Sequence, residues 1–256
     1  MIEENGIFKR AELLLGSDMM DNISEKRVIL FGVGGVGSWC AESLIRTGIK
    51  YLTIVDSDRV SETNINRQLM ATTKTIGEQK VEVLQARLLD INPEAEIKTI
   101  AKVYSEETSA DFELNRYDYI IDAIDSLKHK VHLIQTATRT KARLFSSMGA
   151  ALKIDPTRIK VAEFWKVTGC PLGAALRRKM KQGIKPAKKF LCVYSDELLE
   201  NKGLKYEFDE SKNSEVAKQE NPSVKASTNG TLVHITAIFG FTLAGLVIQD
   251  IVKRNS

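Results

Sequence analysis

The chain has 256 residues, of which 43% are hydrophobic and 27% are charged. This composition is typical of a soluble globular protein and excludes the collagenous and intrinsically disordered classes. Lysine and arginine exceed aspartate and glutamate by 37 to 33, so the net charge of +4 permits a polyanionic partner without requiring one. The 3 cysteines are an odd number at wide spacing, which excludes a disulfide framework and paired zinc knuckles.

The two ends of the chain can be compared with secretory signals and membrane helices, which would determine where the protein is found in the cell. The N-terminal segment starts with acidic residues and lacks a long apolar run, so we expect no secretory signal and a cytoplasmic protein. Residues 231–248 contain His234 as their only ionisable side chain, and this run reaches the length of a membrane helix. Its three threonines and two glycines favour a helix buried in the core or in a dimer interface over a membrane span.

Strand and helix patterns alternate up to residue 147. Short apolar runs predict strands at 27–31, 51–56, 96–103, 117–122 and 142–147. Helical spacing predicts helices at 38–48, 77–92 and 127–139. This alternation predicts an α/β fold with a Rossmann-like, doubly wound and mostly parallel sheet.

Beyond residue 150 the alternation stops. Residues 158–165 are typical of a strand, 171–180 of a basic helix, and 197–225 of a mobile loop of mixed charge. We therefore expect a single domain over 1–256, in which a nucleotide-binding half at 1–150 precedes a less regular half at 151–256.

A glycine-rich segment, GVGGVG, follows the first predicted strand and opens the first predicted helix. Its glycines are Gly32, Gly34, Gly35 and Gly37. Glycine lets the backbone approach a phosphate closely, while free amides and the helix dipole supply positive potential. Asp56 closes the next strand, where its carboxylate can accept hydrogen bonds from ribose hydroxyls. A dinucleotide and ATP satisfy this pattern equally well.

The next segment, DSDRVSETNINRQ, favours ATP, because a dinucleotide enzyme has no use for a polar stretch with an arginine at this place. Asn64 and Arg67 are expected to reach the triphosphate, where a guanidinium neutralises charge that builds on phosphate oxygens. Lys80 heads the inward face of its predicted helix, and a lysine on a buried face requires an anion. The alternative is a lysine that extends from the helix end into solvent.

Two aspartates follow the fourth predicted strand. Asp122 and Asp125 lie where open α/β sheets bind their ligands, just past the carboxyl end of a core strand. Phosphates repel a carboxylate there unless a cation lies between them, so we predict that Asp125 contacts Mg²⁺. A helix cap is the alternative for either aspartate.

A basic run at 177–189 holds seven lysines and arginines and no acidic residue. We predict that it contacts nucleic-acid phosphates, and a solvated basic face is the alternative. The candidate contacts are Arg177, Arg178, Lys179 and Lys181. Cys192 could form a covalent relay, but the pattern around it favours a buried, packed thiol.

Five motifs in order, GVGGVGSW, DSD, NINRQ, GEQK and DAIDS, resemble the ubiquitin-activating-enzyme-like (ThiF/HesA/MoeB-like) adenylating superfamily. The resemblance implies that a substrate carboxylate attacks the α-phosphate of ATP, giving an acyl adenylate and pyrophosphate. It implies a homodimer, because Arg10 matches an arginine that enters the partner subunit's ATP site. The catalytic residues would be Arg10, Arg67, Lys80 and Asp125. The ATP contacts would be the four glycines, Asp56, Asp58, Asn64, Arg67, Gln68, Lys80 and Asp122.

Residues 148–180 and the segment ITAIFGFTLAG are similar to the tRNA threonylcarbamoyladenosine dehydratase branch. This likeness implies adenylation of the threonylcarbamoyl carboxylate on the adenosine 3′ of the anticodon, followed by cyclisation with net loss of water. The implied cofactors are ATP, Mg²⁺ and a monovalent cation, and the implied partners are tRNA and a sulfur-relay protein. The half at 151–256 would then hold the tRNA and the dimer contacts. Cys170 departs from the branch, in which we expect an aspartate before Pro171.

Three other functions remain as alternatives. Adenylation of a ubiquitin-like sulfur carrier is opposed by the missing CxxC pairs and by the lack of a clear catalytic-cysteine loop. A nucleotide-binding scaffold without turnover is opposed by the presence of Arg67, Lys80 and Asp125. An NAD dehydrogenase is opposed by the lack of a catalytic histidine or Lys/Tyr pair after the glycine motif.

Overall fold

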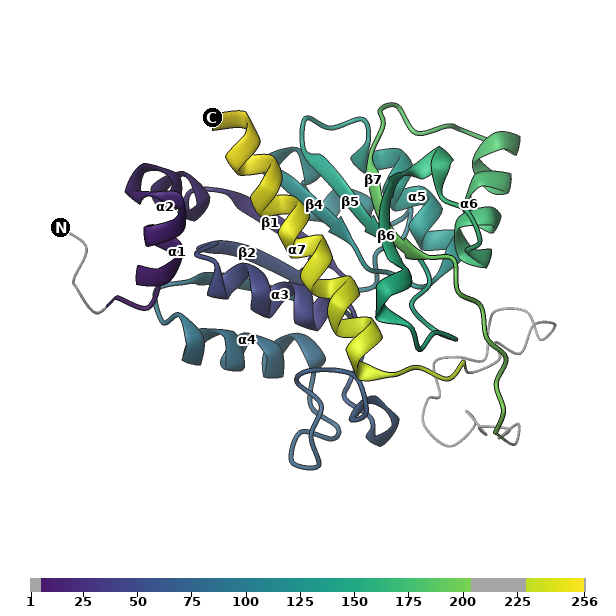
Figure 1. Ribbon diagram of the computed structural model, residues 1–256, viewed down its shortest axis with the longest axis horizontal. Coiled ribbons are helices and arrows are strands. Elements are labelled where there is room, and N and C mark those ends of the chain that lie inside the picture. The colour runs from purple at the N-terminus through teal and green to yellow at the C-terminus, as the bar shows by residue number, and fades with distance from the viewer. Residues whose placement is uncertain (1–5, 204–228, 256) are drawn as a thin grey trace.

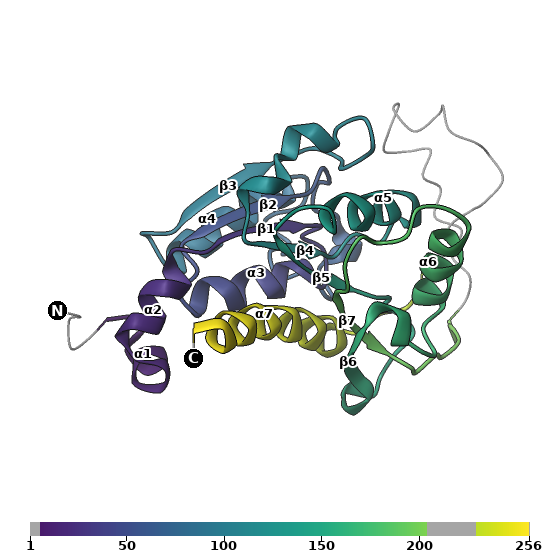
Figure 2. The ribbon, with the colours of Figure 1, turned by 90° about the horizontal axis from the view of Figure 1, so that it is seen from above.

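A computed structural model of the chain describes residues 6–203 and 229–255. In these residues, helices cover both faces of one 7-stranded sheet. Figure 2 shows α3 (Gly37–Arg46) and α7 (Val233–Asn255) on one side of the strands and α5 (Leu127–Ala137) on the other. The layered arrangement confirms the predicted α/β class.

The sheet has the strand order β3-β2-β1-β4-β5-β7-β6. Its strands are β1 (Arg27–Phe31), β2 (Tyr51–Val55), β3 (Glu96–Ile100), β4 (Tyr119–Asp122), β5 (Arg143–Ser147), β6 (Ile159–Glu163) and β7 (Leu191–Ser195). All neighbours pair in parallel except β6, which runs antiparallel to β7 at the edge. The chain leaves β1 toward β2 on one side and later returns to β4 on the other. Ligands of open α/β sheets bind outside the carboxyl ends of the strands at such a switch point.

Two buried cores lie on the two faces of the sheet. One core joins α2 (Ser17–Ser24), α3, α4 (Lys80–Ile91) and α7 to the sheet. The other joins α5 and α6 (Pro171–Gln182) to it. The remaining helix, α1 (Lys9–Leu15), buries no residue. The sheet also crosses the predicted boundary at residue 150, because β7 pairs with β5.

Helix α7 contains the long apolar run noted in the sequence. It is the one helix in the described parts of the chain that is long and apolar enough to cross a membrane, and 56% of its most apolar window is buried inside the protein. A Cβ on Gly240 would lie 2.4 Å from the Val36 carbonyl oxygen of the glycine loop, so α7 crosses the start of α3 at very short range. Its composition is therefore that of a helix that completes a core.

Several boundaries differ from the sequence-based expectations. Helix α4 begins at Lys80 instead of Gly77, because the chain around Arg59 pairs with the chain around Gln79 before the helix starts. The patterns did not single out α1, α2 or β7. The C-terminal helix extends past residue 248 to Asn255. The charged loop expected at 197–225 lies outside the described residues from 204 onward.

Candidate nucleotide-binding and adenylation site

The glycine segment makes a tight turn between β1 and α3. Gly32 has φ +83°, a backbone conformation that favours glycine, and a Cβ there would lie 2.8 Å from the Ala123 carbonyl oxygen. A Cβ on Gly37 would lie 1.8 Å from the Gly32 oxygen. Any side chain at either position would therefore break the turn. By contrast, a Cβ on Gly34 would meet only the Gln68 Nε2 atom at 3.8 Å, so space remains beside the middle of the turn.

Asp56 is fixed against the glycine turn. One carboxylate oxygen accepts a hydrogen bond from the Val33 backbone N–H at 2.9 Å, and the other accepts one from the Asp58 backbone N–H at 2.9 Å. Burial raises the pKa of Asp56, and the charge of Lys80 acts in the opposite direction. The half-buried carboxylate still has lone pairs for ribose hydroxyls, which fits its predicted role.

Lys80 lies inside the protein, as its position on the helical pattern predicts. Only 5% of the residue is exposed. Its ammonium donates to Asp58 Oδ2 at 2.8 Å, while the Asp58 side chain is 66% exposed. The anion that the buried Lys80 contacts is therefore Asp58, whose carboxylate lies between Lys80 and the solvent. A phosphate as a further partner of Lys80 stays a prediction.

Arg67 lies beside the glycine turn, and Asp125 is near enough to affect its charge. The Arg67 guanidinium donates to the Thr63 carbonyl oxygen at 2.8 Å and to Asn66 Oδ1 at 3.0 Å. Burial lowers the pKa of Arg67, and the charge of the exposed Asp125 raises it. A Cβ on Gly35 would lie 3.3 Å from Arg67 Cγ, so the arginine side chain passes directly beside the turn.

Two amide side chains complete this segment. Asn64 is buried and accepts from the Ser61 backbone N–H at 3.1 Å, which shapes the chain before Arg67. Gln68 is also buried, and its Oε1 atom has no hydrogen-bond partner. A buried acceptor without a partner is costly, so an unfilled acceptor beside Gly34 fits a site that receives a ligand with donor groups.

Asp122 has a different environment from the one expected. Its side chain is 0% exposed and forms an ion pair with Lys130, with 2.8 Å between Oδ2 and Nζ. The hydroxyl of Ser146 donates to the same carboxylate at 2.7 Å. The structure thus gives Asp122 a structural role, and its contact with ATP stays a prediction. Ser126 occupies the N-cap position of α5.

Lys130 is a residue that the sequence reading missed, although a signal was present. It occupies an inward position of α5, in line with Leu133, Ile134 and Ala137, as Lys80 does on α4. A lysine at an apolar helical position predicts a buried anion nearby, and here that anion is Asp122.

The remaining predicted residues lie away from the glycine turn. Arg10 is exposed on α1, which precedes β1 and lies at the amino end of the strands, as Figure 1 shows. Three of the basic candidates on α6 are exposed, namely Arg178, Lys179 and Lys181. Arg177 is half-buried, and its Nη1 atom has no hydrogen-bond partner.

All three cysteines are buried. Burial raises the pKa of the Cys192 thiol well above its ordinary value, which opposes a role as a nucleophile. Cys170 caps α6, because its sulfur accepts from the Gly173 backbone N–H at 3.5 Å. The expected aspartate would perform the same capping role with a stronger acceptor.

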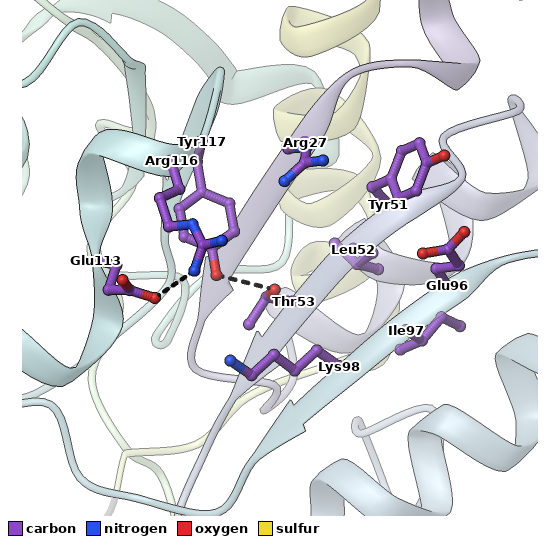
Figure 3. A pocket seen from close by; sticks show the side chains of 10 residues that line it. All are labelled: Arg27, Tyr51, Leu52, Thr53, Glu96, Ile97, Lys98, Glu113, Arg116 and Tyr117. Carbon is purple, nitrogen blue, oxygen red and sulfur yellow. Dashed lines mark hydrogen bonds and ion pairs between the residues drawn. The ribbon is translucent and has the colours of Figure 1, made fainter.

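A pocket of about 440 Å³ lies elsewhere on the sheet. Figure 3 shows Arg27, Tyr51 and Lys98 around it, together with the hydrogen bond from the Tyr117 hydroxyl to Thr53 at 3.1 Å. These residues belong to the first halves of β1, β2 and β3 and to the chain before β4. None of the predicted site residues lines this pocket, so it is separate from the glycine turn at the carboxyl ends of the strands.

The chain is similar to known proteins over nearly its whole length. The chain is 36% identical over 249 residues to a tRNA threonylcarbamoyladenosine dehydratase of Bacillus subtilis, covering 96% of this chain and 94% of that one. It is 34% identical over 249 residues to the enzyme of that name from Escherichia coli, covering 94% and 91%. The crystal structure of the E. coli protein with ATP matches with a TM-score of 0.83 and 31% identity over 97% of this chain and 94% of that one.

The glycine turn, the carboxylate beside it and the segment with Arg67 thus occur in a chain that resembles tRNA threonylcarbamoyladenosine dehydratases along nearly its whole length. The match to the ThiF family extends over residues 8–256. The chain belongs to the ThiF family.

Proposed function

We propose that the protein is an ATP-dependent tRNA threonylcarbamoyladenosine dehydratase. It activates the threonylcarbamoyl carboxylate as an acyl adenylate and cyclises the group with net loss of water. The observation that carries the proposal is the glycine turn, with Asp56 bound to its Val33 N–H, the Arg67 side chain beside Gly35 and the loop of Asp125 against Gly32. Two curated relatives with this name match over more than nine-tenths of the chain, and the E. coli relative was solved in complex with ATP.

The first step joins the substrate carboxylate to the α-phosphorus of ATP. A carboxylate oxygen attacks this phosphorus, the bond to the oxygen that bridges to the β-phosphate breaks, and pyrophosphate leaves. Negative charge shifts among the phosphate oxygens during the displacement. Arg67 and Lys80 supply the cationic groups that neutralise it, while Asp56 accepts hydrogen bonds from the ribose hydroxyls.

The second step needs no nucleophile from the protein. An atom of the same threonylcarbamoyl group attacks the activated carbonyl carbon, and AMP leaves with one of the original carboxylate oxygens, which accounts for the lost water. A tethered nucleophile gains an effective concentration of about 10⁵ M or more when it is well oriented. The burial of Cys192 supports this route over a covalent relay of the sulfur-carrier type.

The exposed carboxylate of Asp125 fits a Mg²⁺ ion that arrives with ATP. Proteins hold Mg²⁺ through one or two carboxylates together with substrate phosphates. In residues 6–203 and 229–255 no group of three histidine, cysteine, aspartate or glutamate side chains could hold a metal alone. When bound, the ion supplies positive charge next to the phosphates. A monovalent cation stays a prediction.

The surface of the protein supports two partners. Helix α1 carries Arg10 and buries no residue, and the nearby Ile7, Leu13 and Leu14 are 65%, 76% and 82% exposed. These apolar side chains support a homodimer in which Arg10 enters the partner's site. The exposed basic face of α6 supports contact with tRNA phosphates. A cytoplasmic location stays a prediction. A sulfur-relay partner stays a prediction.

One experiment tests the reaction directly. tRNA that carries threonylcarbamoyladenosine is incubated with the protein and ATP, digested to nucleosides and analysed by mass spectrometry. We expect a nucleoside lighter by one water and one AMP released for each nucleoside formed. The Asp125→Asn variant should remain folded and form no product. Turnover only after addition of a sulfur-carrier protein would support the alternative function, and ATP binding without any turnover would contradict both.

A further inference from the structure

Trp39 connects three parts of the structure next to the glycine turn. It lies in the first turn of α3, two positions after Gly37. Its indole Nε1 donates a hydrogen bond to the Arg67 backbone oxygen at 3.1 Å. Its ring meets the Phe241 ring of α7 edge to face, with 5.8 Å between the centroids. One side chain thus joins α3, the Arg67 segment and α7.

The neighbouring residue makes a second link to the same segment. Ser38 is 0% exposed, and its hydroxyl donates to the Gly34 carbonyl oxygen at 2.7 Å. The same hydroxyl accepts from the Leu69 backbone N–H at 3.2 Å. Two consecutive residues of α3 therefore hold the chain at 67–69 against the glycine turn.

This attachment matters because Arg67 lies outside regular secondary structure. The chain between the short helix at Glu62–Asn64 and α4 contains no helix or strand. An arginine side chain in such a stretch loses much conformational freedom when it binds a phosphate, and a fixed backbone lowers that cost. The Trp39 hydrogen bond fixes the backbone oxygen of the residue whose guanidinium must reach the ligand.

We infer that Trp39 is a positioning residue that holds Arg67 over the glycine turn for ATP. The inference rests on the proposed function, because it assumes that Arg67 contacts the phosphates. Phe241 supports the indole from α7. The last helix of the fold thus helps to place the arginine of the site.

The Trp39→Phe variant tests the inference, because it keeps an aromatic ring against Phe241 and removes the hydrogen-bond donor. The matched control is Trp165→Phe, since the chain has 2 tryptophans and Trp165 lies on the separate segment Phe164–Lys166. We expect Trp39→Phe to weaken ATP binding in calorimetry about three- to tenfold. The KM for ATP should rise, the KM for tRNA should not change, and the control should behave as wild type.

A double-mutant cycle separates positioning from a general structural role. In an Arg67→Ala background, Trp39→Phe should weaken ATP binding no further, because the guanidinium that it positions is absent. An equal loss in both backgrounds would overturn the inference. A changed molecular mass of Trp39→Phe in light scattering would also overturn it, because it would assign Trp39 to a subunit contact.

The two proposals fail in different ways. If the wild-type protein does not bind ATP, the proposed function fails. If the wild type binds ATP and Trp39→Phe binds it equally well, only the positioning role of Trp39 fails.

Discussion

Asp122 and Lys130 form an ion pair in which neither side chain has any exposed surface. The pair joins the end of β4 to the second turn of α5. Lys130 also donates to the Ile124 carbonyl oxygen at 3.0 Å, in the loop that carries Asp125 and touches Gly32. The pair therefore fixes the chain that presents Asp125.

Breaking this pair from one side should be costly. Lys130→Met leaves Asp122 charged or protonated without its partner in a closed interior, and we expect a loss of about 3–5 kcal/mol in the free energy of unfolding. Chemical denaturation measures this loss. The double variant Asp122→Asn with Lys130→Met should lose less than Lys130→Met alone, because no unpaired charge remains. Wild-type stability of the single variant would show that the pair is absent in solution.

The crossing of α3 and α7 predicts opposite effects for two glycines of one helix. A Cβ at Gly240 would approach Val36 O and Cys40 N at 2.4 and 2.8 Å, so Gly240→Ala should destabilise the protein by about 2 kcal/mol or more. A Cβ at Gly245 would meet nothing within 4 Å, so Gly245→Ala should stabilise it by about 0.5–1 kcal/mol through helix propensity. Thermal unfolding of the two variants side by side checks the contrast, and equal melting temperatures would refute the close crossing.

The buried Glu42 predicts a pH dependence of stability. Burial raises its pKa, but the guanidinium groups of Arg87 and Arg46, at 2.7 and 2.8 Å, outweigh this effect and lower the pKa below its ordinary 4.5. A carboxyl with a lowered pKa in the folded state adds stability above its unfolded pKa, and this stability is lost as the pH falls through the folded pKa.

Glu42→Gln should therefore be less stable than wild type by about 1–2 kcal/mol at neutral pH, because a charged hydrogen-bonded pair is lost. The difference should shrink as the pH falls from about 5 to 3. Urea unfolding at several pH values measures it. A difference that stays constant down to pH ~3 would contradict the assignment.

The basic face of α6 predicts the salt dependence of tRNA binding. Each phosphate contact releases counterions, so Arg178→Ala and Lys181→Ala should each reduce the slope of log affinity against log salt by roughly 1. Fluorescence anisotropy with labelled tRNA at several salt concentrations measures the slopes. Lys102→Ala serves as the control, since Lys102 pairs with Asp111 at 2.9 Å in the segment after β3. Unchanged slopes for the α6 variants would leave this helix without a role in RNA binding.

Arg10 predicts complementation between subunits. If it acts in the partner's site, Arg10→Ala and Asp125→Ala homodimers are each inactive for different reasons. Mixed and allowed to exchange, they should regain roughly a quarter of the wild-type rate, because half of the dimers then contain one intact site. The nucleoside assay measures the recovery. A mixture that stays inactive although the subunits exchange would rule out a shared site.

The strands and α-helices between residues 27 and 147 could be predicted from the sequence, because buried parallel strands appear as apolar runs and the glycine turn has a distinctive spacing. The inward direction of Lys80 also follows from helical periodicity. Strand β7 was not recognised, because its five residues resemble any short apolar run and its place in the sheet depends on pairing with β5, far away in sequence. Helix α1 was not recognised because it has only 7 residues and none of them is buried, so its apolar pattern is short and weak.

In the site, too, residues that belong to short motifs can be predicted from the sequence, whereas contacts between distant parts of the chain cannot. The glycines, Asp56 and Arg67 belong to local motifs, so their place around one turn could be predicted. The environment of Asp122 could not, because it depends on how α5 docks against β4 and on Ser146 from the neighbouring strand. The hydrogen bond from Trp39 to Arg67 joins residues 28 positions apart and has no sequence pattern of its own.

Helix α7 follows every other element in chain order, yet Ile235, Phe239, Leu243, Val247 and Ile251 are all fully buried in the core of the first half. During synthesis on the ribosome, α3 and the sheet emerge long before the helix that covers them. A nascent or prematurely terminated chain that lacks α7 therefore exposes the apolar face of α3 and the sheet. Exposed apolar surface of this kind promotes aggregation and is recognised by chaperones. The core between α3 and the sheet is therefore complete only after α7 has been synthesised.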